Sequence, residues 1–63
     1  MLVLAEEYVD IYGWEDAVNR FVNDLMRGDE ATFKQGYTKE NAIIATAEAF
    51  DLNVDQVRDL LND

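Results

Sequence analysis

The sequence predicts an all-α fold, a small single-domain bundle of three main helices plus one or two short ones across residues 1–63. Two observations predict it. Apolar residues recur at intervals of three and four between the glycines at positions 13, 28 and 36, which is the period of a helix with one buried face. The sequence also has no proline, the residue that most often interrupts a helix.

Residues 2–12 form the first predicted helix. Its apolar side carries four large side chains: Leu4, Tyr8, Ile11 and Tyr12. Its polar side carries three acids: Glu6, Glu7 and Asp10. Gly13 follows, and we expect the helix to end or kink there because glycine weakens a helix interior.

Residues 14–27 give the clearest helical pattern in the chain. Seven side chains recur along one stripe: Trp14, Ala17, Val18, Phe21, Val22, Leu25 and Met26. Glu15 and Asp16 in the first turn and Arg27 in the last turn match the helix dipole. Gly28 stands where a left-handed residue commonly ends a helix.

The next segment is short and mixed, and then a third helix is predicted. The sequence "DEATFK" at 29–34 suggests a single helical turn that anchors Phe33 in the core. Thr38 is a good N-cap for a helix over residues 39–50. Four alanines in that helix, at 42, 45, 47 and 49, favour close approach to a neighbouring helix. Its bulk comes from three larger residues: Ile43, Ile44 and Phe50.

The last helix has a complete set of start signals. Asn53 is an N-cap, Gln56 is placed to bond back to it, and Leu52 with Val57 fits a hydrophobic staple. The predicted buried stripe that follows has four members: Val54, Val57, Leu60 and Leu61.

The two C-terminal helices resemble a helix-turn-helix motif. The resemblance rests on the spacing of small, turn and apolar positions: Ala47, Asp51, Leu52, Val57 and Leu60. The pattern departs at Asp51, where glycine is usual. A DNA reader would present basic or amide side chains on its second helix, whereas this helix exposes more acids than bases. We therefore expect no direct contact with nucleic acid, and a regulator of this type would need a basic partner.

The same stretch also has the oxygen spacing of an EF-hand calcium loop. The candidate ligands are Asp51, Asn53, Asp55 and Asp59. Gln56 stands where that loop needs glycine, and Asn62 stands where it needs a bidentate glutamate. We expect no metal site here.

Composition excludes much chemistry. The chain has no cysteine, histidine or serine, so the common nucleophile–base arrangements and Cys/His zinc sites are absent. We expect a non-enzyme without a cofactor. No apolar run has the length of a membrane span, and "MLVLA" lacks the basic residues of a signal peptide. A cytoplasmic location is the expectation.

Net charge is the strongest global signal. Fourteen acids against five bases give a net charge of −9, spread along the chain. Such a field repels nucleic acid and anionic lipid and attracts basic protein surfaces. The five bases do not cluster, and we expect them to pair locally, for example Arg20 with Asp16.

These observations favour a small acidic protein-interaction module. Tyrosine and tryptophan supply area and a polar group at interfaces, although some of these rings are needed for the core. The predicted partner-binding residues are Glu6, Glu7, Asp10, Asp55, Asp59, Tyr8, Tyr12 and Trp14. In size and charge the chain is similar to phage- or plasmid-encoded inhibitors, some of which mimic DNA. The alternatives are acids that only solubilise the surface, and a structural homo-oligomer, such as a homodimer, formed through the aromatic face.

Overall fold

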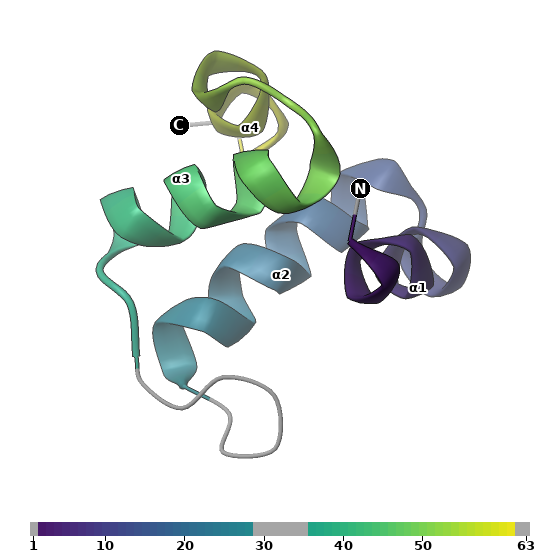
Figure 1. The fold of residues 1–63 in the computed structure, drawn as a ribbon, viewed down its shortest axis with the longest axis horizontal. Coiled ribbons are helices and arrows are strands. Elements are labelled where there is room, and N and C mark those ends of the chain that lie inside the picture. The colour runs from purple at the N-terminus through teal and green to yellow at the C-terminus, as the bar shows by residue number, and fades with distance from the viewer. Residues whose placement is uncertain (1, 29–35, 62–63) are drawn as a thin grey trace.

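The computed structural model describes residues 2–28 and 36–61, and it confirms the all-α prediction. Its helices are α1 (Val3–Tyr12), α2 (Trp14–Arg27), α3 (Lys39–Phe50) and α4 (Val54–Leu61). Their bounds agree with the four predicted segments to within one residue. The predicted turn at 29–34, with Phe33, lies outside the described residues. Figure 1 shows α2 and α3 packed together, with α1 and α4 set against different parts of this pair.

Two glycines end the first two helices as predicted. Gly13 has φ +83°, and its N–H donates to the Val9 carbonyl, so the chain leaves α1 and enters α2 at once. Gly28 is left-handed, and its N–H donates to the Asp24 carbonyl. A positive φ strains any residue that has a Cβ atom, which explains why glycine suits both positions.

Side chains cap α3 and α4 at their starts. The Thr38 hydroxyl accepts a hydrogen bond from the N–H of Asn41 at 3.2 Å. Asn53 and Gln56 form a reciprocal capping box, with N···O distances of 2.9 and 2.8 Å. Between these helices Asp51 adopts the left-handed conformation with φ +57°, which aspartate tolerates better than most residues. The tight turn therefore forms without the usual glycine.

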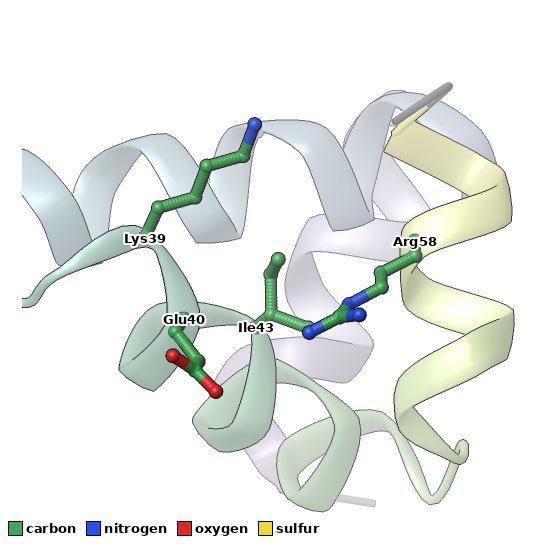
Figure 2. Close-up of a pocket in the computed structure, with 4 residues that line it drawn as sticks. All are labelled: Lys39, Glu40, Ile43 and Arg58. Carbon is green, nitrogen blue, oxygen red and sulfur yellow. The ribbon is translucent and has the colours of Figure 1, made fainter.

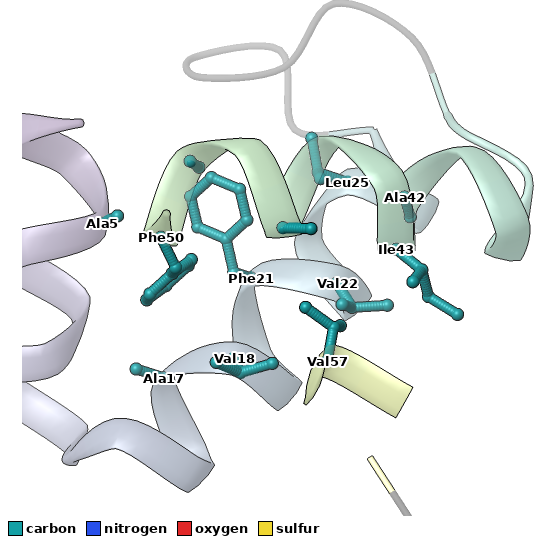
Figure 3. Close-up of a cluster of buried hydrophobic side chains, with 12 residues drawn as sticks. Ala5, Ala17, Val18, Phe21, Val22, Leu25, Ala42, Ile43, Phe50 and Val57 are labelled. Carbon is teal, nitrogen blue, oxygen red and sulfur yellow. The ribbon is translucent and has the colours of Figure 1, made fainter. Parts of the chain in front are cut away.

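The core forms where α2 meets the other three helices. Its largest fully buried apolar side chains are Phe50, Val18 and Val57. Burying a side chain of this size contributes about 1.5–3 kcal/mol. Small residues allow the helices to approach closely, and those with under 5% exposure are Ala5, Ala17, Ala42, Ala47 and Ala49. Figure 3 shows Phe21 and Phe50 together between α2 and α3, with Ala5 of α1 on one side.

Three large non-aromatic apolar residues, Ile11, Ile44 and Met26, lie outside the core, against expectation. Ile11 is 71% exposed, because α1 turns Ala5 to the core, with Leu4, Tyr8 and Val9 partly buried around it. Ile44 faces solvent on the side of α3 away from its buried alanines. Met26 is 40% exposed near the end of α2.

The arrangement separates the first and last helices. Each of them packs on α2 and on α3, but α1 and α4 do not contact one another. Any two surfaces that these helices carry are therefore distinct. Within the part of the chain that the structure describes, no helix has both the length and the apolar character to cross a membrane.

Candidate interaction surfaces

The predicted acidic residues divide into two surfaces. Glu6, Glu7 and Asp10 are exposed on α1, and we call them the α1 acidic surface. Asp55 and Asp59 are exposed on α4, and we call them the α4 acidic surface. Because α1 and α4 do not contact one another, the two acidic surfaces are separate. The sequence alone did not reveal this separation.

The α4 acidic surface belongs to a helix that packs against both α2 and α3. Val57 is fully buried, whereas the other members of the predicted stripe, Val54, Leu60 and Leu61, are only partly buried. Asn19 of α2 donates through Nδ2 to the Leu60 carbonyl at 3.1 Å, which ties the end of α4 to α2. A polar residue like Asn19 gives no periodic signal, so the sequence analysis missed this contact.

The geometry of the 51–59 stretch is that of a capped helix. The Asn53 side-chain oxygen accepts from the Gln56 N–H, and residues 54–61 are helical. An EF-hand loop would instead turn these oxygens toward one point. Among the described residues, no three acidic side chains gather closely enough to hold a metal ion.

Tyr8 of α1 mainly contacts α2 within the same chain. Its hydroxyl donates to the Asp24 carboxylate on α2, and Asp24 also pairs with Arg27 at 2.9 Å. Its half-buried ring packs edge-on against Phe21, with centroids 5.2 Å apart. Tyr8 was predicted to bind a partner, and the structure gives it a role in joining α1 to α2.

Tyr12 lies at the exposed corner between α1 and α2. Its side chain is 39% exposed, and the guanidinium carbon of Arg20 lies 4.3 Å from the ring centroid. This is a cation–π contact. Arg20 was expected to pair with Asp16, so the ring of Tyr12 takes the place of that acid. The contact also shows that one face of Tyr12 already binds a guanidinium group.

Trp14 is the most exposed aromatic side chain of the predicted set. It was expected in the buried stripe of α2, but it is 47% exposed in the first turn of that helix. Its inner part meets Phe50, with ring centroids 6.0 Å apart. Like Tyr12, it presents a large area of ring to solvent.

The rings of the predicted aromatic patch fall into two contacting groups. The rings of Tyr8 and Tyr12 meet at 5.9 Å, and Trp14 packs on Phe50 instead. Phe21 connects the two groups through the core, 5.2 Å from both Tyr8 and Phe50. A chain of rings thus runs from one exposed side of the α1–α2 corner, through the interior, to another.

Two bases line a hollow of about 530 Å³ between α3 and α4. Lys39 and Arg58 line it with Glu40 and Ile43, although the sequence suggested that the bases do not cluster. Figure 2 shows the Lys39 amine directed toward α2 and the Arg58 guanidinium directed toward Ile43. The two cations do not converge on a common point, so the hollow is not a focused anion site.

The fold and these surfaces define a small acidic helical domain whose described residues include three exposed aromatic side chains, Tyr12, Trp14 and Tyr37. Comparison with known families, characterised proteins and solved structures gave no match to this chain. Its chemistry must be inferred from its own residues.

Proposed function

We propose that this chain is a small acidic protein-interaction module that docks on a basic surface of another protein. The observation that carries the proposal is the α1–α2 corner. Tyr12 and Trp14 are both substantially exposed there, and their neighbours Asp10, Glu15 and Asp16 are exposed acids. Aromatic area supplies affinity, while acids around it select a basic partner and speed the encounter.

The charge distribution supports the same partner class. A net charge of −9 on 63 residues gives a strong negative field, and exposed acids occur on both α1 and α4. A protein that binds nucleic acid offers the matching basic surface. The chain would then compete with nucleic acid for that surface by mimicking its charge, as an inhibitor does. Direct binding to DNA is disfavoured, since Asp55 and Asp59 would face phosphates.

Charge reversal on one surface at a time tests the proposal. One variant carries Glu6→Lys, Glu7→Lys and Asp10→Lys, and a matched variant carries Asp55→Lys and Asp59→Lys. All five positions are exposed, so both variants should remain folded by circular dichroism. A pull-down from the source cell should recover a basic partner with the wild type and lose it with at least one variant. Retention of the partner by both variants contradicts docking through these acids.

A structural homo-oligomer is the second candidate, and one observation favours it. Leu2, Val3 and Ile11 are exposed apolar residues at or within α1, with exposures of 59%, 71% and 71%. Association through these apolar residues would be nearly independent of salt. Sedimentation at two protein concentrations separates the candidates: a dimer that persists at high salt and is lost in Ile11→Asp supports the oligomer.

A helix-turn-helix regulator acting with a basic partner is the third candidate, based on the tight turn between α3 and α4. A gel-shift assay with duplex DNA tests it. The acidic module predicts no shift by this chain alone at physiological salt, and a shift would favour the regulator.

A further inference from the structure

An apolar groove lies between the start of the chain, α2 and α3. Its volume is about 440 Å³, and its lining residues are Leu2, Phe21, Leu25, Tyr37, Ala45, Glu48 and Ala49. The floor combines core residues of α2 with small residues of α3. Leu2 and Tyr37, at 59% and 41% exposure, form the walls. The groove is separate from the α4 acidic surface.

Backbone hydrogen bonds hold both walls in place. The Leu2 N–H donates to the Ala49 carbonyl at 2.9 Å, which fixes the beginning of the chain beside α3. The Tyr37 N–H donates to the Leu25 carbonyl at 2.9 Å, which fixes the opposite wall beside α2. A preformed groove of this kind lowers the ordering cost of binding, because its walls are already positioned.

Charge at the groove selects its occupant. Glu48 is the one charged residue among the described residues that line it, and it is exposed. An apolar side chain can therefore fill the groove while a neighbouring cation meets this carboxylate. A second copy of the chain is a poor occupant. In a symmetric dimer the same patch faces itself, so two Glu48 carboxylates and two charges of −9 would be brought together.

We propose that this groove binds a segment of a basic partner, taking one apolar or aromatic side chain into the groove and placing an adjacent guanidinium or ammonium group against Glu48. This inference rests on the proposed function for the class of partner. It adds a specific pocket to an interaction otherwise described by exposed acids and aromatic rings.

A small probe tests the groove without the partner. Phenethylguanidine combines an aromatic ring with a guanidinium group, and 2-phenylethanol is its neutral counterpart. Titration of each into the ¹⁵N-labelled chain is followed by NMR. We expect phenethylguanidine to shift the amide signals of Leu25, Ala45 and Ala49 in a saturable manner, and to bind more tightly than the neutral probe.

Matched variants identify the charge that matters. Glu48→Gln should weaken phenethylguanidine binding by roughly two- to fivefold, the size expected for one exposed ion pair. Glu40→Gln, at another exposed acid of α3 that lines a different hollow, should leave it unchanged. Binding of 2-phenylethanol should not respond to either substitution.

Three results would overturn the inference: no shift at the groove, equal loss in both variants, or groove signals that move with protein concentration in the absence of probe. The last result would show that a second copy covers the groove. Failure here is distinguishable from failure of the proposed function, because charge reversal on α1 or α4 would still release the partner.

Discussion

Thr46 presents a buried hydroxyl in the middle of α3. The residue is fully buried, and its Oγ1 has no hydrogen-bond partner within the described structure. Such a group loses its hydration without compensation, which costs about 1–3 kcal/mol. Valine has nearly the same shape and carries no polar atom.

Replacing this hydroxyl should therefore not harm the fold. We predict that Thr46→Val leaves the free energy of unfolding unchanged or raises it by about 1 kcal/mol. Thr38→Val is the matched control, because it removes a hydroxyl that caps α3 and should cost about 1 kcal/mol. Urea unfolding followed by circular dichroism measures both. Equal destabilisation by the two substitutions would contradict this account of Thr46.

Tyr8 shows the opposite case, a hydroxyl with a charged partner. Its hydrogen bond to Asp24 joins α1 to α2, and such a bond to a charged group is worth about 1.5–3 kcal/mol when buried. Since Tyr8 is only half-buried, we predict a loss of about 1 kcal/mol for Tyr8→Phe in the same unfolding experiment. Tyr12→Phe, at the exposed corner, should change stability by less than about 0.5 kcal/mol. Similar losses in the two variants would show that the Tyr8–Asp24 bond does not stabilise the fold.

Among the helices, α4 is the one whose stability depends most on its N-terminal cap. It has eight residues, and an isolated helix of that length is unstable in water. The Asn53–Gln56 capping box and the buried Val57 hold it in place.

We predict that Asn53→Ala lowers the free energy of unfolding by about 1 kcal/mol and speeds amide hydrogen exchange in α4 more than in α2. Asn41→Ala is the control, because the Asn41 side chain is exposed within α3 and its capped N–H is retained. If exchange in α4 is the same in both variants, the cap does not determine the stability of this helix.

The helix bounds could be predicted because their signals are local. Gly13, Gly28, Thr38 and the Asn53–Gln56 pair each act within one turn of the chain. Which side of α1 faces the core could not be predicted in the same way. Ile11 is larger and more apolar than Ala5, yet Ala5 is buried, because close approach of α1 to α2 and α3 requires a small residue. That requirement depends on neighbours distant in sequence.

The same limit applied to the candidate surfaces. Exposed acids followed directly from composition and helical spacing. The separation of α1 from α4, the stacking of Arg20 on Tyr12 and the groove beside Glu48 each depend on how the helices pack. Trp14 was misplaced because periodicity cannot tell whether the first turn of a helix has a neighbour to cover it.

At the scale of the whole molecule, charge and packing have separate roles. The core lies where α2 meets the other helices. Asp24 is more buried than the other described acids, and its side chain is still 25% exposed. The outward surfaces of α1 and α4 can therefore carry many acids without weakening the interior. The chain of ring contacts from Tyr12 through Tyr8, Phe21 and Phe50 to Trp14 links the α1–α2 corner to the core. The exposed aromatic side chains are therefore packed against other rings on their inner sides.

We propose that acids drive docking on a basic partner. The affinity for the captured partner, measured as a function of sodium chloride concentration, tests this proposal. Screening shortens the reach of charge from about 10 Å at 0.1 M to about 3 Å at 1 M. We predict that affinity falls steeply over this range, and that the charge-reversed variant with the larger loss also shows the shallower salt dependence. An affinity that does not change with salt, and that survives charge reversal on both α1 and α4, would contradict the claim.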